Sequence, residues 1–296
     1  MKQKNYSGSL EMKLFPYFLI LPNLLIFVLF IATPAFFGFY FSLTEWNGIN
    51  QPEFIAFANY AKAFGDHRFW TSFGRTCVYV VCTLPFMMVV PLFFANLMVK
   101  EIRCRSFFRA VFYWPSMISY IVIGLSFKFI FGNDTGIVNY LLTSFGLQRV
   151  EWMTQATTAT VVLMVAHVWS RTGFFMVNYI AGLQSISPSL YEAAQIDGAT
   201  KSQQFFRVTL PMLRPTTFLV MVLAMIDLFK VYALVISFTN GGPGGATRYV
   251  VQYIYEKAFR EMNLGYASAL SMLMLVIMAV ITVVQFSVSK GGQVDG

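Results

Sequence analysis

Six long apolar stretches constrain the fold of this 296-residue chain more than any other feature. Each is about 20 residues or longer, enough for a helix to cross the hydrocarbon core of a membrane. In lipid, only helices and closed barrels satisfy every backbone polar group. We therefore predict an all-α polytopic membrane protein that forms one domain over residues 1–296. Its six transmembrane helices are predicted at residues 14–43, 72–98, 110–131, 156–182, 216–238 and 264–289.

The composition and the placement of charge agree with this class. Hydrophobic residues make up 57% of the chain and charged residues 11%, whereas soluble domains average about 25% charged residues. The net charge of +8 comes largely from basic residues in alternate loops, which are Lys100, Arg103, Arg105, Arg109, Lys201, Arg207 and Arg214. Cytoplasmic loops carry an excess of Lys and Arg. The sequence thus predicts a protein of the cell membrane with both termini in the cytoplasm.

Other simple classes of site find little support in the sequence. Cys77 and Cys82 fall in a predicted span and Cys104 in a basic cytoplasmic loop, where the compartment is reducing. With only His67 and His167 available, no Cys/His cluster has the spacing of a metal site. We therefore expect neither a disulfide framework nor a metal site. Kinks are expected at prolines within spans, such as Pro85, Pro91 and Pro115.

The loop at residues 183–215 is the longest polar interruption in the C-terminal half of the chain. Ser189 and Glu192 have the spacing of a capping box, and Thr200 and Gln203 repeat it. Gly198 lies where a left-handed helix stop is needed. The loop is therefore predicted to form two short helices joined by a bend, with a surface of small residues suited to docking against another protein.

The same loop carries a resemblance to a known family. Glu192-Ala193-Ala194, Gly198 after three more residues, and Val208-Thr209-Leu210-Pro211 after nine more have the spacing of the EAA signature. At these residues the chain resembles the permease subunits of binding-protein-dependent ABC importers. Thr239–Gly244 and Gly265–Ala269 extend the likeness to the carbohydrate-uptake branch, and it covers nearly the whole chain. Val208 stands where the family favours Ile.

The resemblance implies a set of partners. They are a homologous second permease, two ATPase subunits that bind ATP and Mg, and an extracytoplasmic solute-binding protein. The cytoplasmic coupling helix would sit in a cleft of an ATPase subunit through Glu192, Ala193, Ala194, Asp197, Gly198, Leu210 and Pro211. The solute-binding protein would contact Asn240, Gly241, Gly242, Pro243 and Gly244. The sequence holds no glycine-rich phosphate-binding run, so we expect no cofactor in this chain and no enzymatic activity of its own.

Polar residues in the fourth and fifth spans are candidates for a solute path. Spans four and five place ionisable groups inside the membrane, where such groups generally face a bundle interior or a wet cavity. In span four the polar residues share one helix face, at spacings i, i+3, i+4 and i+7. The resemblance implies that these two helices line the path, and the candidates are His167, Ser170, Arg171, Phe174, Asp227, Lys230 and Val231. The structural alternative is an ion pair that locks the bundle, between Asp227 and either Lys230 or Arg171.

Three alternatives for function remain open from the sequence. The main hypothesis is a path for a sugar or oligosaccharide. Arg171 and Asp227 are charged where the family is expected to have small or neutral polar residues, so a phosphorylated polyol or an acidic sugar is the alternative solute. A polytopic membrane enzyme using His167, Arg171 and Asp227 is a second alternative, although these groups lack a nucleophile-and-base arrangement. A secondary transporter would usually carry more spans or inverted repeats.

Overall fold

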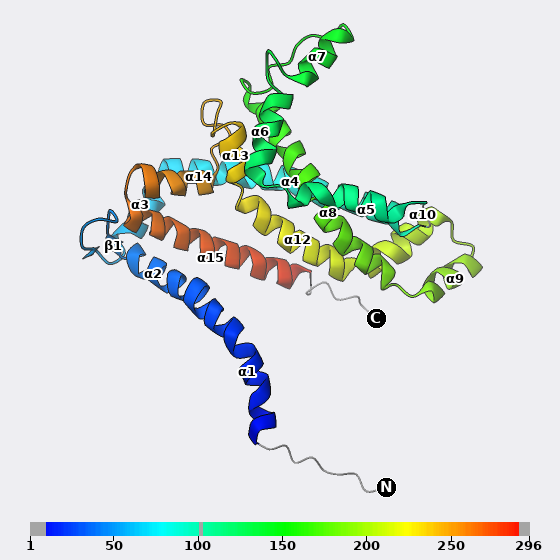
Figure 1. The fold of residues 1–296 in the computed structure, drawn as a ribbon, viewed down its shortest axis with the longest axis horizontal. Helices are drawn as coiled ribbons and strands as arrows, with labels where there is room; N and C mark the ends of the chain where they lie inside the picture. The colour runs from blue at the N-terminus through cyan, green and yellow to red at the C-terminus, as the bar shows by residue number, and fades with distance from the viewer. Residues whose placement is uncertain (1–9, 101–102, 290–296) are drawn as a thin grey trace. The chain divides into compact units, whose positions relative to one another are not determined.

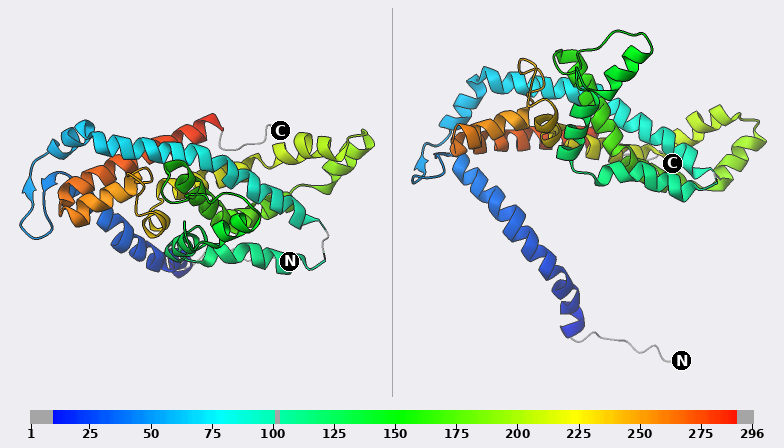
Figure 2. Two further views of the ribbon diagram at one scale, coloured as in Figure 1. Left: turned by 90° about the horizontal axis from the view of Figure 1, so that it is seen from above. Right: turned by 45° about the horizontal axis from the view of Figure 1, so that its top comes forward.

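The computed structural model describes residues 10–100 and 103–289, which are almost entirely helical (Figures 1 and 2). The first part of the chain forms α1 (Leu10–Phe27), η1 (Val28–Ala32), α2 (Thr33–Ser42), β1 (Thr44–Glu45), β2 (Glu53–Phe54), α3 (Ala58–Gly65) and α4 (His67–Val99). The middle forms α5 (Arg105–Tyr113), η2 (Trp114–Met117), α6 (Tyr120–Ile130), α7 (Ile137–Ser144), α8 (Ala156–Gln184) and α9 (Pro188–Ile196). The last part forms α10 (Lys201–Gln204), η3 (Phe205–Thr209), α11 (Leu210–Met212), α12 (Arg214–Phe229), α13 (Ala233–Phe238), α14 (Val250–Tyr255), η4 (Glu256–Arg260) and α15 (Leu264–Val288).

Contacts within the chain divide it into two compact units. The first comprises the described parts of Met1–Gly65 and Glu256–Leu275. The second comprises the described parts of Asp66–Tyr255 and Val276–Gly296. α15 therefore contributes residues to both units.

In the first unit a short hairpin is held between helical segments. β1 pairs antiparallel with β2, with Thr44 opposite Phe54. The Asn59 side-chain amide donates hydrogen bonds to the carbonyl oxygens of Ser42 (3.0 Å) and Thr44 (2.8 Å). A Cβ on Gly265 would lie only 2.1 Å from the Thr44 carbonyl oxygen, so only glycine permits this close approach of the α15 backbone to the hairpin.

The second unit is built around α4, which packs along α8 and α12, while α13 packs on α6 (Figures 1 and 2). α4 begins at Asp66, whose carboxylate accepts hydrogen bonds from the backbone N–H groups of Arg68 (3.0 Å) and Phe69 (3.2 Å). That cap satisfies two N–H groups that a helix start would otherwise leave unpaired. Apolar side chains make up most of the core between these helices, with Leu163 and Leu228 fully buried.

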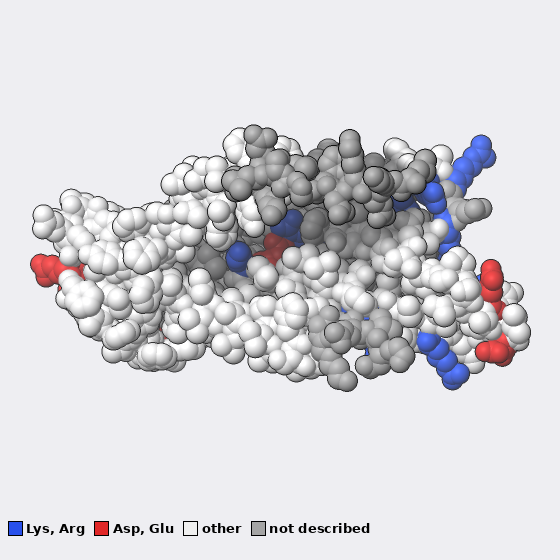
Figure 3. Space-filling view, turned by 90° about the horizontal axis from the view of Figure 1, so that it is seen from below, with Lys and Arg blue, Asp and Glu red and all other residues white. Residues whose placement is uncertain are grey.

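Four helical stretches in the described residues are long and apolar enough to cross a membrane. They are Phe15–Ser42, His67–Val99, Ala156–Gln184 and Leu264–Val288. Two bent pairs, Arg105–Met117 with Tyr120–Ile130 and Lys201–Met212 with Arg214–Phe229, would raise the number to six if each pair is one span. Large areas of the face drawn in Figure 3 carry no charged side chains. The predicted all-α polytopic class is confirmed, while the number of six depends on how the bent pairs are counted.

The predicted span at residues 110–131 is sharply bent. The chain tightens into the single turn of η2 at Trp114–Met117, passes through extended residues, and restarts at α6 with a bend of 98°. Pro115 lies in η2, and the side chain of Ser119 caps the new helix by accepting from the Ile121 N–H (3.3 Å). The kink expected near Pro115 is thus present, whereas Pro85 and Pro91 lie inside an uninterrupted α4.

The predicted span at residues 216–238 is also interrupted. α12 ends at Phe229 and α13 begins at Ala233, because Tyr232 adopts a non-helical backbone conformation (φ −144°, ψ −60°). The break follows directly on the turn that carries Asp227. α12 therefore ends about half a turn after Asp227, which is a predicted residue of the solute path.

Candidate functional site

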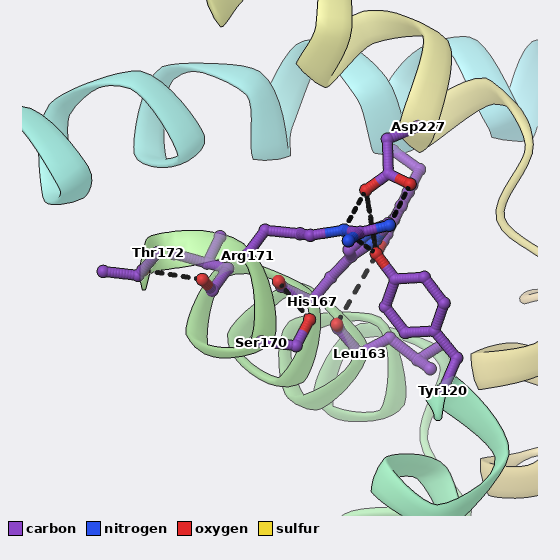
Figure 4. A network of polar contacts seen from close by, with 9 residues as sticks. Tyr120, Leu163, His167, Ser170, Arg171, Thr172 and Asp227 are labelled. Carbon is purple, nitrogen blue, oxygen red and sulfur yellow. Dashed lines mark hydrogen bonds and ion pairs between the residues drawn. The ribbon is translucent and has the colours of Figure 1, made fainter. Parts of the chain in front are cut away.

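Four elements of the second unit bring polar side chains together around one carboxylate. Asp227 lies in the last turn of α12, and Tyr120 is the first residue of α6. His167 and Arg171 lie one turn apart on α8, and Tyr79 comes from α4. Figure 4 shows the side chains of Arg171, His167 and Tyr120 converging on Asp227. We call Tyr79, Tyr120, His167, Arg171 and Asp227 the polar network.

The Asp227 carboxylate accepts four hydrogen bonds. Arg171 donates twice, from Nε to Oδ2 (2.8 Å) and from Nη2 to Oδ1 (2.9 Å). Tyr120 Oη donates to Oδ2 (2.8 Å), and His167 Nε2 lies 3.1 Å from the same oxygen. A two-point contact with a guanidinium is the strongest arrangement for a carboxylate. The geometry therefore gives Asp227 full compensation of its charge.

His167 links this carboxylate to α4. Its side chain is 1% exposed, and Nδ1 lies 2.9 Å from the Tyr79 hydroxyl. Because a carboxylate only accepts, Nε2 donates to Asp227, and Nδ1 forms the second hydrogen bond, with the Tyr79 hydroxyl. Both ring nitrogens therefore have a partner. The network thereby joins α4, α6, α8 and α12.

The charges of Arg171 and Asp227 are paired, but the network remains partly accessible to solvent. The side chains of Arg171 and Asp227 are 28% and 21% exposed, unlike that of His167. The Arg171 guanidinium also donates from Nε to the Tyr120 hydroxyl (2.6 Å) and lies 4.9 Å from the centre of that ring. The accessible part of the network therefore presents an aromatic ring beside a neutral ion pair.

The remaining predicted path residues take different positions. Ser170 is buried and donates to the carbonyl of His167 in its own helix (2.8 Å). Phe174 is 36% exposed, one turn beyond Arg171. Lys230 ends α12 and is exposed, while Val231 is buried. Of the two ion pairs considered from the sequence, the structure forms the one with Arg171. The role of these residues in a solute path stays a prediction.

The loop after α8 forms the two predicted short helices, with one error in the capping. The capping box of Ser189 and Glu192 is wrong, because α9 starts at Pro188 with Ser187 as its N-cap. Starting at Pro188 puts a residue without an N–H in the first turn, where that group is not needed. The second box is confirmed, with Thr200 capping α10 and Gln203 returning the contact. Gly198 has φ +75°, as its predicted left-handed stop requires.

Large apolar side chains are exposed on this loop. Ile196 is 86% exposed at the end of α9, and Phe206 is 63% exposed in η3. Glu192, Ala193 and Asp197 are exposed as well. The two arms of the loop are tied together, since the hydroxyls of Tyr191 and Thr209 lie 3.0 Å apart. The loop therefore has a defined structure, and it exposes an apolar surface together with the carboxylates of Glu192 and Asp197.

The glycine-rich loop at Thr239–Thr247 is also held in place. Four of its residues have positive φ angles, which are Asn240, Gly241, Gly244 and Gly245. The Thr247 hydroxyl donates to the Gly242 carbonyl (2.6 Å), and Arg75 of α4 donates to the Gly245 carbonyl. The predicted binding-protein contact surface at Asn240–Gly244 therefore lies on a loop with a defined shape, and its role stays a prediction.

Several of these residues could not be predicted from the sequence. Tyr79 and Tyr120 lie in predicted apolar spans, and their partners lie 88 and 107 residues away in the chain. The only signal was a hydroxyl inside a predicted span, which is common. Ile196 and Phe206 carried a clearer signal, because both are large apolar residues in a loop predicted to be cytoplasmic.

Comparison with known proteins agrees with the resemblance that the sequence carries. A family model for the inner membrane component of binding-protein-dependent transport systems matches residues 54–291. The chain belongs to this family. It is 33% identical over 276 residues to the probable starch degradation products transport system permease protein AmyD of Thermoanaerobacterium thermosulfurigenes, covering 93% of this chain and 94% of the relative.

Solved structures extend the family likeness to the whole fold. A bacterial ABC transporter involved in the import of the acidic polysaccharide alginate contains a chain that matches with a TM-score of 0.81 and 26% identity, over 95% of this chain and 96% of that chain. A bacterial alginate ABC transporter in complex with an alginate pentasaccharide-bound periplasmic protein matches with a TM-score of 0.79 and 25% identity, over 95% and 97%. The resemblance to ABC importer permeases stated from the EAA signature is confirmed.

The ion pair at the centre of the network can be tested by removing its charges one at a time. We expect Arg171→Gln and Asp227→Asn each to destabilise the assembled protein by about 3 kcal/mol, the lower end for breaking a buried pair, because both side chains keep some exposure. The double variant should recover much of that loss. Thermal unfolding of the membrane complex measures the effect, with Lys230→Gln on the exposed end of α12 as the control. Single variants as stable as the wild type would show that the pair does not hold the helices together.

Proposed function

We propose that this chain is the permease subunit of an ABC importer for a carbohydrate, and that the polar network lies on its solute path. The observation that carries the proposal is the partly exposed Arg171–Asp227 pair beside the Tyr120 ring, inside a family that transports solutes. Sugars are recognised by hydrogen-bonding groups next to aromatic rings, and this is what the open side of the network offers. The similarity to AmyD supports a carbohydrate.

The charge balance of the network favours a neutral sugar or oligosaccharide. The Arg171 guanidinium is already bound at two points by Asp227, so an acidic group on the solute would have to displace a carboxylate. An isolated arginine would suit an acidic sugar or a phosphorylated polyol, but the pair has no net charge. The likeness to the alginate importer keeps an acidic sugar as the second candidate.

The loop at residues 183–215 is proposed to couple the permease to ATP hydrolysis in separate subunits. The exposed apolar side chains Ile196 and Phe206 support a protein partner there, because such residues gain by leaving water. Glu192 and Asp197 would pair with basic residues of that partner. In this proposal the chain is no enzyme and needs no cofactor, and ATP and Mg bind the ATPase subunits.

The other partners follow from the same proposal. A homologous second permease would complete the solute path, and an extracytoplasmic solute-binding protein would deliver the sugar to the loop at Asn240–Gly244. The family description and the alginate complex support a binding-protein partner. Both termini and the coupling loop would face the cytoplasm, in line with the basic residues of alternate loops.

Gly198→Asp should abolish coupling, because an added side chain with a charge strains a left-handed backbone position on the docking loop. Gly146→Asp is a matched control. The two glycines have φ +75° and +74°, and neither has an atom within 4 Å of its would-be Cβ. Only the Gly198 variant should lose the stimulation of ATP hydrolysis by solute-loaded binding protein. Equal loss in both variants, or in neither, would contradict the docking role.

Topology can be checked by chemical labelling in a variant without Cys77, Cys82 and Cys104. We expect Ser189→Cys to react with a membrane-impermeant thiol reagent only from the cytoplasmic side. Gln148→Cys, in the loop between α7 and α8, should react only from the opposite side. Both positions are exposed, so access alone decides the result. Labelling of both from one side would overturn the proposed orientation.

The solute class can be tested with the reconstituted importer and its binding protein. A neutral maltodextrin should be taken up with ATP hydrolysis, and an alginate oligosaccharide of equal length should not, since the paired Arg171 offers it no free charge. Uptake of the alginate oligosaccharide alone would favour the second candidate. Failure of both, with an importer that still responds to another class of solute, would refute a carbohydrate.

A further inference from the structure

A large apolar groove lies on the second unit, apart from the polar network. Its volume is about 780 Å³, and it runs between α4, α5, η2 and α8. Its walls include Phe86, Val90 and Phe94 of α4, Val111 of α5, and Val165 and Trp169 of α8. Its lining is almost wholly apolar. A ligand for this groove must itself be apolar along most of its length.

The groove and the polar network occupy neighbouring faces of α8. Successive residues of a helix are rotated by about 100°, so residues two apart point in nearly opposite directions. Val165 is two residues before His167, and Trp169 is two residues before Arg171. Val165 and Trp169 therefore face away from the network, whereas Met164, seven residues before Arg171, lies at the boundary between the two faces.

The groove is within reach of a lipid chain from the end of α4. With a rise of about 1.5 Å per residue, Phe94 and Phe86 of α4 lie roughly 9 Å and 21 Å along the helix from Lys100. Half the hydrocarbon core of a bilayer is about 15 Å thick. For a helix along the membrane normal, an acyl chain that entered the groove from the end of α4 would thus meet Phe94 within its own leaflet, and Phe86 lies just beyond the midplane.

Basic residues gather at that end of α4 and the start of α5. Lys100, Arg103, Arg105 and Arg109 lie within ten residues of sequence that contain one acid, Glu101. Arg103 and Arg105 are exposed. Arg109 Nη2 donates to the Met98 carbonyl (3.1 Å), while its buried Nε has no hydrogen-bond partner among the described residues. Basic pockets at the cytoplasmic ends of transmembrane helices suit anionic lipid headgroups.

We propose that this groove binds one acyl chain of an anionic phospholipid, with the lipid phosphate held by Arg105 and Arg109. The apolar walls would bind the acyl chain, and the positive charge at the mouth of the groove would select an anionic headgroup. Arg109 and Arg105 lie three and seven residues before the groove residue Phe112, on the same face of α5, so headgroup and chain sites adjoin each other. The bound lipid would brace α5 against α4 and α8 at the sharply bent third span.

Native mass spectrometry of the whole importer, extracted from vesicles of equal phosphatidylglycerol and phosphatidylcholine, tests the proposal. The wild type should retain phosphatidylglycerol in preference to phosphatidylcholine. Arg105→Gln and Arg109→Gln should each weaken that retention by about five-fold, the effect of one basic residue at an anionic surface. Arg149→Gln, which removes an exposed charge from the loop before α8, should leave it unchanged.

A second pair of variants tests the chain site without touching the charges. Val90→Trp fills the groove and should reduce retention of phosphatidylglycerol, while Val89→Trp, next to it on α4 but outside the lining and 63% exposed, should not. Equal retention in Val90→Trp and Val89→Trp would overturn the proposal. So would cross-linking of the second permease to Val90 in the assembled importer, since a protein helix would then occupy the groove.

Discussion

The carboxylate of Asp227 is the group on which the second unit depends. A charge within an apolar helix is stable only if partners replace the water that it has lost. Arg171, His167 and Tyr120 do so from two other helices, and Tyr79 extends the chain of contacts to a fourth. The break between α12 and α13 follows within one turn, and the bent start of α6 supplies Tyr120. The two interrupted spans, predicted at residues 110–131 and 216–238, thus meet at the polar network.

This arrangement connects stability with transport. A network that joins four helices resists their movement, yet a permease must change the access of its path during each cycle. The two-point pair of Arg171 and Asp227 joins α8 to α12, and α8 is followed by α9 of the loop at residues 183–215. Under the proposed docking role, a movement imposed on that loop would reach the network through α8. The exposed side chains of Ile196 and Phe206 would then form part of the contact with the partner.

Much of the fold could be predicted from the sequence because hydrophobicity over about 20 residues is a strong signal. Local rules also predicted the bend at Gly198 and the cap at Thr200, since both depend on neighbouring residues alone. The capping of α9 was placed two residues late, because Ser187 and Ser189 both suit an N-cap and Pro188 decides between them. The interruption after Phe229 had no local signal, as no proline or glycine marks it.

The site was predictable only in part. His167, Arg171 and Asp227 stood out as ionisable residues in apolar spans, but their partner tyrosines did not. The two possible pairings of Asp227 could not be separated by sequence, because Lys230 lies one turn away on the same helix. The tertiary approach of α8 to α12 decides for Arg171. That pairing favours the neutral sugar of the main hypothesis over the acidic solute that the sequence left open as an alternative.

Thiol protection at Phe174 tests most directly whether the face of α8 that carries the network lines the solute path. Phe174→Cys, in an importer otherwise free of cysteine, should react with a membrane-impermeant reagent, and solute-loaded binding protein with ATP should protect it. Trp169→Cys, on the face of α8 that lines the apolar groove, should give no solute-dependent protection. Phe174 is partly exposed and lies outside the hydrogen-bonded network, so the substitution leaves the ion pair intact. A Phe174→Cys importer that transports normally and shows no protection in any state would contradict the account.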